Sequence, residues 1–204
     1  MSKITRVIPL TDTPYVRMYQ LEGINKAGKS HNYYLASRTM RPEELKLYTR
    51  RDTADGVVIY ALDDQGRMVL VRQYRCTIDD YIYELPAGLV EPGEDYRQAA
   101  IREMKEETGL TFVPLEAPAW MEKPLYTTIG LTDEACATVY GRASGQVSQE
   151  NLEENEELEI VLADRQEAKR ILREERVALM CGYQMMHYIS DEEPFGFLGE
   201  KTLA

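Results

Sequence analysis

The sequence predicts an α/β protein: an α/β/α sandwich built on a mixed β-sheet, with an additional antiparallel β-region at the N-terminus. Three observations support this class. A strand, a glycine-containing loop and a helix follow one another over residues 81–109, residues 56–74 have the pattern of a hairpin, and helical patterns return after residue 164. Strands and helices in this order are typical of a sheet covered by helices.

The first fifty residues are expected to form the additional β-region. Residues 15–21 and 32–36 are rich in strand formers, and the connection between them contains Gly23, Asn25 and Gly28. An isolated two-stranded unit is marginal in water, so this hairpin needs a partner surface. We expect two parts, an N-terminal β-region at residues 1–50, whose partner surface could be a second subunit or the chain's own core, and a main domain at residues 51–204.

The elements of the main domain are predicted from local patterns. A second hairpin with a turn at 63–66 pairs residues 56–62 with residues 67–74. Asp164 is placed to cap a helix that runs to about residue 173, and an apolar stripe predicts another helix at 175–189. Further short strands are expected near residues 111–121, 123–128, 135–142 and 157–162.

A helix is also predicted over residues 95–108, directly after the glycine-containing loop. No proline or glycine interrupts it, its alanines and glutamates favour helix, and Gly109 is placed to end it in a left-handed conformation. Glu103, Glu106 and Glu107 share one arc within little more than one turn. Such crowding of like charge disfavours a bare helix. Divalent cations, which prefer oxygen ligands, would explain it.

Residues 88–110 match a known motif at every specified position, with the spacing Gly-x5-Glu-x7-Arg-Glu-hydrophobic-x-Glu-Glu-x-Gly-hydrophobic. The segment therefore resembles the Nudix box, whose family hydrolyses nucleoside diphosphates linked to another moiety with Mg²⁺ or Mn²⁺. The resemblance implies that Glu103 and Glu107 are the main metal ligands. Glu106 would assist them or act as a base, the Ala87 carbonyl would complete the site, and Arg102 would orient a glutamate.

Three segments outside the box resemble the ADP-ribose and nucleotide-sugar pyrophosphatase branch of that family, at residues 49–56, 71–75 and 84–88. In that branch an arginine at the position of Arg75 contacts the diphosphate, and one near Arg50 or Arg51 does likewise. Bidentate guanidinium groups suit a pyrophosphate, although a surface ion pair is the alternative for each arginine.

The same branch implies a homodimer in which the N-terminal strands are exchanged between the subunits. Tyr33 is then one of several N-terminal tyrosines that are candidates to stack on an adenine ring. The alternative is that these tyrosines pack the hairpin or the dimer interface.

The segment TTIGLTDE at residues 127–134 resembles a mobile loop that carries a catalytic glutamate in related enzymes. Glu134 takes the place of that glutamate and is expected to activate or position the attacking water when substrate and metals are bound. An exposed loop glutamate is the alternative. Ile129 stands where the branch has a proline that marks ADP-ribose hydrolysis, and the spacing from the box is a few residues longer. Another nucleotide sugar, a dinucleotide or a damaged nucleotide therefore stays open as the substrate.

Charge and composition limit the partners. The net charge of −11 argues against nucleic acid, and it is compatible with a phosphate substrate if metals screen the carboxylates. Much of the excess lies at residues 150–159, which we interpret as a solvated acidic loop. No apolar run approaches the roughly 18 residues of a membrane span. The N-terminal segment lacks a signal-peptide core, and the three cysteines show no metal spacing, so a cytoplasmic protein is expected.

The predicted function is metal-assisted hydrolysis of a nucleoside diphosphate derivative, with ADP-ribose giving AMP and ribose 5-phosphate. A ligand sensor that kept the fold without the chemistry is an alternative from a different class. Such modules usually lose carboxylates of the box, and none is missing here. An interaction protein with an acidic surface would leave the box unexplained.

Overall fold

The structure, a computed structural model, describes residues 2–152, 157–193 and 195–198. Its contacts divide the chain into two compact units. The N-terminal unit comprises Met1–Asp55 and Pro124–Cys136, and the sandwich unit comprises Gly56–Lys123 and Ala137–Ala204. The acidic segment of the sequence falls partly outside the described residues, at 153–156.

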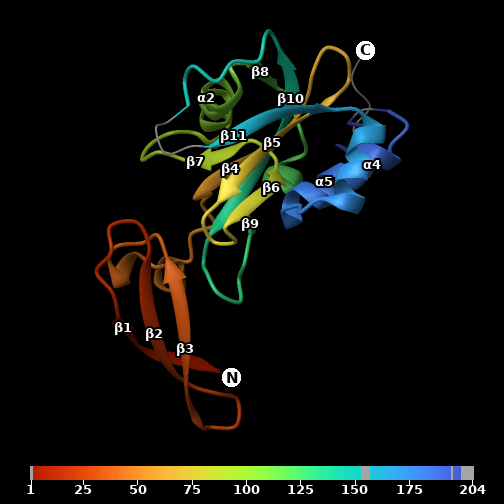
Figure 1. The fold of residues 1–204 in the computed structure, drawn as a ribbon. Coiled ribbons are helices and arrows are strands. Elements are labelled where there is room, and N and C mark those ends of the chain that lie inside the picture. Colours follow the sequence, from red (N-terminus) through yellow and green to blue (C-terminus); the bar gives the residue numbers. More distant parts are fainter. Residues whose placement is uncertain (1, 153–156, 194, 199–204) are drawn as a thin grey trace. The chain divides into compact units, whose positions relative to one another are not determined.

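The N-terminal unit is an antiparallel sheet in the order β1-β2-β3, covered on one face by short helical turns (Figure 1). Tyr19, Leu21 and Leu35 alternate with more exposed residues along the strands, and they pack together with Leu45. This alternation buries one face of the sheet. The elements are β1 (Lys3–Pro9), β2 (Arg17–Ile24), β3 (Ser30–Ser37), η1 (Pro42–Glu44), α1 (Lys46–Thr49) and β9 (Leu125–Tyr126).

The sandwich unit is built on a larger sheet in the order β11-β5-β4-β10-β8, with β6 beside β5 and β7 beside β4. Its strands are β4 (Gly56–Leu62), β5 (Met68–Arg75), β6 (Asp80–Glu84), β7 (Ala87–Leu89), β8 (Thr111–Pro114), β10 (Ala135–Ser144) and β11 (Leu158–Ala163). Its helices are α2 (Tyr96–Thr108), α3 (Ala119–Glu122), α4 (Arg165–Glu174), α5 (Leu179–Ser190) and η2 (Gly196–Leu198).

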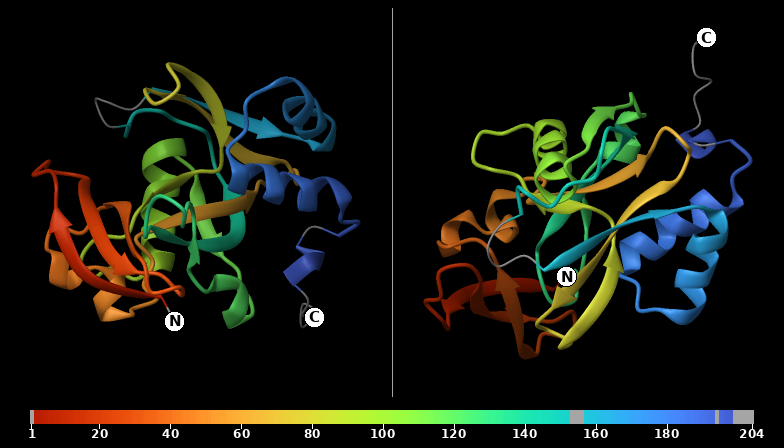
Figure 2. Two further views of the ribbon diagram at one scale, coloured as in Figure 1. Left: turned by 90° about the horizontal axis from the view of Figure 1, so that it is seen from below. Right: turned by 45° about the horizontal axis from the view of Figure 1, so that its top comes forward.

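Helices cover both faces of this sheet. Figures 1 and 2 show α2 on one side of the central strands and α4 with α5 on the other. All of β4 is buried, as expected for a strand covered on both faces. Ala99, Ala100 and Met104 of α2 pack against Val57 and Ile59 of β4, and the two alanines allow a close approach of helix and sheet.

The predicted α/β class with an N-terminal antiparallel region is confirmed, and so are both hairpins and the helix over 95–108. No helix in the described part of the chain is long and apolar enough to cross a membrane.

Three local predictions were wrong. The strand expected near 111–121 ends at Pro114, and a helical turn follows at α3. The last helix begins at Leu179 instead of residue 175, because Tyr83 of β6 exchanges backbone hydrogen bonds with Arg176 and Ala178 and keeps that segment extended. Ala87–Leu89, read as part of a loop, forms β7 against β4.

Candidate active site

Helix α2 carries Glu103, Glu106 and Glu107 of the box, and both of its ends are fixed locally. The Asp95 side chain accepts a hydrogen bond from the Arg97 backbone N–H at 2.9 Å, which caps the N-terminus. Gly109 ends the helix with φ of 72° and donates its N–H to the Lys105 carbonyl at 3.0 Å. The position of each carboxylate along the helix is therefore well defined.

Strand β7 approaches this helix closely. The Ala87 N–H donates to Glu107 Oε2 at 3.2 Å, and Glu107 is 3% exposed. A Cβ atom added to Gly88 would lie 1.9 Å from Glu103 Cδ, so only glycine leaves room for that carboxyl group. The strand thus brings Ala87 and Gly88 against two of the three predicted metal ligands.

Arg102 binds the remaining carboxylates of the box. Its Nε and Nη2 donate to the two oxygens of Glu94, both at 3.0 Å, and Nη2 also donates to the Leu89 carbonyl at 2.9 Å. Its Nη1 bridges Glu103 Oε1 at 2.8 Å and Glu106 Oε2 at 2.9 Å. The hydrogen bonds from Arg102 lower the pKa of Glu94, so that carboxyl group stays ionised.

The carboxylates of the box are ligands that a hard divalent cation prefers, but they are not grouped around a single point that could hold one. Glu103, Glu106 and Glu107 offer carboxylate oxygens, which Mg²⁺ and Mn²⁺ prefer. In the described part of the chain, no three acidic, histidine or cysteine side chains are grouped so that they could hold a metal ion. Arg102 Nη1 lies between Glu103 and Glu106 instead. Nη1 contacts Oε1 of Glu103 and Oε2 of Glu106, and each carboxylate has a second oxygen through which it could bind a cation while Arg102 stays in place.

Arg75, predicted to contact a diphosphate, lies at the end of β5 in the sandwich unit. Its Nε and Nη2 donate to the two oxygens of Glu84 at 2.8 and 2.6 Å. The Glu84 side chain is 16% exposed and that of Arg75 is 45% exposed. A bidentate pair of this kind fixes the plane of the guanidinium. Sequence reasoning placed Glu84 in a resembling segment but gave it no role.

The other predicted substrate residues belong to the N-terminal unit. The Tyr33 hydroxyl donates to the Gly130 carbonyl, and its side chain is partly exposed. Arg50 ends α1 in a left-handed conformation with φ of 56° and lines a cavity together with Lys3 and Tyr48. Arg51 is exposed. Tyr33 thus lies on β3, whereas Arg50 and Arg51 lie at and just after the end of α1.

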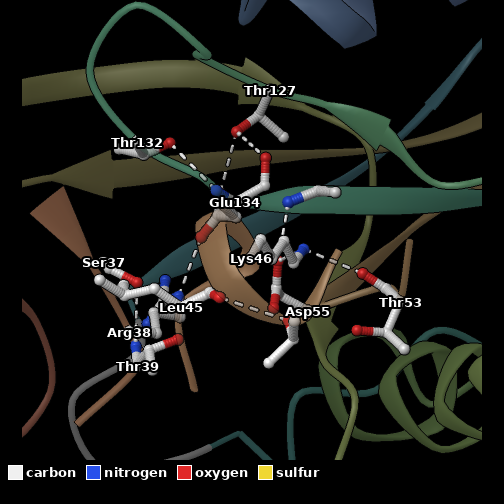
Figure 3. A network of polar contacts seen from close by, with 12 residues as sticks. Ser37, Arg38, Thr39, Leu45, Lys46, Thr53, Asp55, Thr127, Thr132 and Glu134 are labelled. Carbon is white, nitrogen blue, oxygen red and sulfur yellow. Dashed lines mark hydrogen bonds and ion pairs between the residues drawn. The ribbon is translucent and has the colours of Figure 1, made fainter. Parts of the chain in front are cut away.

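Glu134 also belongs to the N-terminal unit, where a polar network surrounds it (Figure 3). Arg38 Nε donates to its Oε2 at 2.9 Å, and the Thr127 hydroxyl donates to its Oε1 at 3.2 Å. Sequence reasoning missed Arg38 and Thr127. Glu134 lies 96 residues from Arg38 and 7 residues from Thr127 along the chain. Only the spacing to Thr127 is short enough for a local sequence pattern to indicate.

Comparison with known proteins places this arrangement in a family. A model of the NUDIX domain matches residues 52–179, which contain the whole box. Among solved structures, a chain described as an ADP compounds hydrolase superposes with a TM-score of 0.61, covering 85% of this chain and 83% of that chain. Its sequence identity is 21%, so this likeness shows the fold alone.

Two curated relatives share part of the sequence. A Caenorhabditis elegans protein whose name assigns it to the nudix hydrolases is 38% identical over 155 residues, which cover 74% of this chain and 62% of that protein. An ADP-ribose pyrophosphatase of Bacillus subtilis (strain 168) is 29% identical over 122 residues, which cover 59% of this chain and 64% of that protein. The match therefore spans less than two thirds of the length of either relative.

Proposed function

The chain belongs to the Nudix family, and we propose that it hydrolyses the diphosphate linkage of a nucleoside diphosphate derivative. We propose ADP-ribose or a related ADP-sugar as the substrate, with AMP and a sugar phosphate as the products. The observation that carries the proposal is the group of carboxylates that α2 presents around Arg102 and β7. The similarity to a Bacillus subtilis protein named as an ADP-ribose pyrophosphatase supports this choice of substrate class.

Glu103, Glu106 and Glu107, with the Ala87 carbonyl, would hold Mg²⁺ or Mn²⁺. Divalent cations at such a site supply Lewis-acid activation of water and of the phosphoanhydride, and they neutralise charge on the departing phosphate. The grouping of carboxylates supports this assignment. The Arg102 guanidinium pairs with Glu94, Glu103 and Glu106, and Glu107 adds a fourth carboxylate beside the Ala87 N–H.

The chain's own groups would orient these ligands and the substrate. The Ala87 N–H fixes the rotamer of the buried Glu107. Arg102 restrains Glu103 and Glu106 and anchors the loop before the helix through Glu94 and the Leu89 carbonyl. Arg75 is the candidate to bind the diphosphate, with Glu84 setting the plane of its guanidinium. Arg50, Arg51 and Tyr33 stay predictions for substrate binding.

Two carboxylates are candidates to take the proton from the attacking water. Glu106 is the more exposed member of the box, with a side chain that is 46% exposed. Glu134 is the candidate that the family resemblance indicates. Replacement of each by glutamine, measured at saturating Mg²⁺, separates them, because the base should show the larger loss of turnover number.

A panel of nucleoside diphosphate derivatives tests the proposal. ADP-ribose, ADP-sugars, other nucleotide sugars and dinucleoside polyphosphates should be incubated with the protein with and without Mg²⁺, and the nucleotide products measured. We expect metal-dependent AMP release, fastest with ADP-ribose or an ADP-sugar. Faster cleavage of another nucleotide sugar or of a dinucleoside polyphosphate would assign that compound class as the substrate instead. No turnover with metal-independent ligand binding would favour the sensor alternative.

We also propose a homodimer that uses the N-terminal unit. Tyr34 and Ile24 lie on the outer face of the sheet and are 51% and 43% exposed, although both are large apolar or aromatic side chains. Burial of this face against a second copy would remove that surface from water. Light scattering on a size-exclusion column should give twice the chain mass, and replacing Tyr34 by aspartate should weaken the dimer.

We also propose that the protein is located in the cytoplasm, which is a reducing compartment. None of the three cysteines forms a disulfide. Burial raises the pKa of the Cys136 thiol to about 11 and that of Cys181 to about 12, so both stay protonated and unreactive at neutral pH. Fractionation of cells that express the full chain would test the location.

A further inference from the structure

The base of the loop at residues 127–134 is closed by backbone hydrogen bonds within the N-terminal unit. The Thr127 N–H donates to the Glu134 carbonyl at 3.0 Å. The next residue, Ala135, donates its N–H to Asp55 Oδ2 at 2.8 Å and accepts the Asp55 N–H at 2.7 Å. Both the N–H and the carbonyl of Ala135 are therefore hydrogen-bonded to Asp55.

The group that holds Ala135 is itself fixed. Lys46 Nζ donates to Asp55 Oδ2 at 2.5 Å and to the Thr53 carbonyl at 3.0 Å, and the Lys46 side chain is only 11% exposed (Figure 3). An ion pair that is largely removed from water is screened little by salt. Asp55 thus forms a rigid base for the end of the loop.

The tip of the loop lies along β3. The Ala36 N–H donates to the Leu131 carbonyl at 2.9 Å, Ala36 and Thr132 form a parallel bridge, and the Tyr33 hydroxyl donates to the Gly130 carbonyl. These contacts attach the tip of the loop to β3 through one isolated bridge and hydrogen bonds to the Gly130 and Leu131 carbonyls.

The Glu134 carboxylate is held by the residue that directly follows β3. Arg38 binds one oxygen of Glu134, and the Thr127 hydroxyl binds the other. The chain beyond Arg38 is anchored as well, because the Tyr19 hydroxyl donates to the Thr39 carbonyl at 2.6 Å and the Tyr19 ring is fully buried. The guanidinium therefore extends from a fixed backbone.

We infer that Arg38 is a positioning residue for Glu134, and that β3 and the loop at 127–134 form one support that holds this carboxylate in a single orientation. The inference rests on the proposed function for the participation of Glu134 in turnover. An unrestrained glutamate side chain has several rotamers, and ordering it costs free energy during each turnover. A displacement of about 1 Å from the productive geometry can cost about 10²-fold in rate.

Replacement of Arg38 by alanine tests the inference in steady-state hydrolysis of ADP-ribose. We expect kcat to fall about 10-fold with KM within about 2-fold, because the lost restraint acts on the reacting step. Arg38→Lys should recover part of the loss, since an ammonium group can make one charged hydrogen bond. Arg41→Ala is the matched control. Arg41 is also an exposed arginine paired with a glutamate, Glu44, and its loss should leave kcat unchanged.

A double-mutant cycle separates positioning from general damage to the fold. In the Glu134→Gln background, Arg38→Ala should cause no further loss beyond about 2-fold, because the group that Arg38 orients is already lost. If the loss of kcat in the double variant equals the product of the losses in the two single variants, the inference is overturned. Equal kcat values for Arg38→Ala and Arg41→Ala would overturn it too.

Amide hydrogen exchange tests the same contact without any turnover. Peptides covering residues 127–135 should exchange faster in Arg38→Ala than in the wild type and in Arg41→Ala. Unchanged exchange would overturn the positioning role even in an active enzyme. If the wild type cleaves no nucleoside diphosphate derivative but exchange does increase, the proposed function fails and the structural support of Glu134 by Arg38 stands.

Discussion

Helix α2 carries two clusters in which one arginine binds several carboxylates, and the clusters differ in their charge balance. In the first, near the N-terminus of the helix, Arg97 binds Glu116 and Glu122. In the second, about one and a half turns later, Arg102 binds Glu94, Glu103 and Glu106. Similar residue types thus produce two arrangements on one helix.

The first cluster pairs one arginine with one buried and one exposed carboxylate. Arg97 Nη2 donates to both oxygens of Glu122 at 2.8 and 2.7 Å, and the Tyr96 hydroxyl donates to the same carboxylate at 3.2 Å. The Glu122 side chain is 7% exposed, whereas that of Glu116 is 91% exposed and solvated. A buried ion pair remains that connects α3 to the first turn of α2, and it needs no cation.

The second cluster has more carboxylates for its one arginine. Arg102 pairs with three of them, and the nearly buried Glu107 adds a fourth beside Ala87. What distinguishes the second cluster is that Glu103, Glu106 and Glu107 all extend from one helix, and that the strand with Ala87 and Gly88 packs closely against two of them. Carboxylate oxygens grouped in this way are the ligands that a hard divalent cation prefers.

The largest expected effect is the loss of a ligand from the second cluster. Glu107→Gln should reduce turnover of ADP-ribose by at least about 10²-fold, because the amide keeps an acceptor for the Ala87 N–H but loses the charge. Product formation is measured by chromatography, and thermal unfolding serves as the control for an intact fold. A rate within about tenfold of the wild type would contradict the metal assignment.

A smaller loss is expected when the arginine of the second cluster is changed. Arg102→Lys keeps the charge, but an ammonium group cannot reproduce the bridging and bidentate contacts of the guanidinium. We expect turnover to fall about 10- to 100-fold, with more Mg²⁺ needed for half-maximal activity. Titrations of rate against Mg²⁺ measure both values. Unchanged titrations would show that Arg102 does not organise the ligands.

The first cluster should respond in stability instead of turnover. Glu122→Gln leaves Arg97 without its charged partner, and we expect a loss of about 2 kcal/mol in the free energy of unfolding. This is less than the roughly 3–5 kcal/mol of a fully buried pair, since Arg97 is partly exposed. Urea titration measures the change, and the turnover number should stay within about threefold. A loss of turnover with an unchanged free energy of unfolding would contradict the structural role of the first cluster.

The smallest effect is expected at the exposed member of the first cluster. Glu116→Gln should leave the free energy of unfolding close to that of the wild type, because an ion pair in contact with water contributes little. The same urea titration measures it beside Glu122→Gln. A loss as large as that of Glu122→Gln would mean that burial does not separate the two glutamates.

The helix and its box could be predicted from the sequence because their signals are local. Asp95, Gly109 and the uninterrupted helical stretch between them specify the helix and both of its ends. The three glutamates of the box share an arc through helical geometry alone. The structure adds what local patterns cannot show, namely the pairing of β7 with β4 that places Ala87 and Gly88 against the carboxylates.

The first cluster and the support of Glu134 could not be predicted, because both depend on contacts between distant parts of the chain. Arg97 meets Glu122 across 25 residues, and α3 was expected to be part of a strand. Arg38 meets Glu134 across 96 residues. No periodicity in one segment of sequence indicates such pairs. Glu84 is only nine residues from Arg75, and this pair was missed because its contact depends on how the neighbouring strands β5 and β6 align.

The most direct test of the central claim is AMP release from ADP-ribose by chelator-treated protein during a titration with Mg²⁺. The grouping of Glu103, Glu106 and Glu107 on one helix predicts no release without the cation and a saturable increase as Mg²⁺ is added, and Glu107→Gln should remove nearly all of this increase. Release that is independent of the cation, or a titration that is the same in Glu107→Gln as in the wild type, would contradict the assignment of the second cluster as the catalytic metal site.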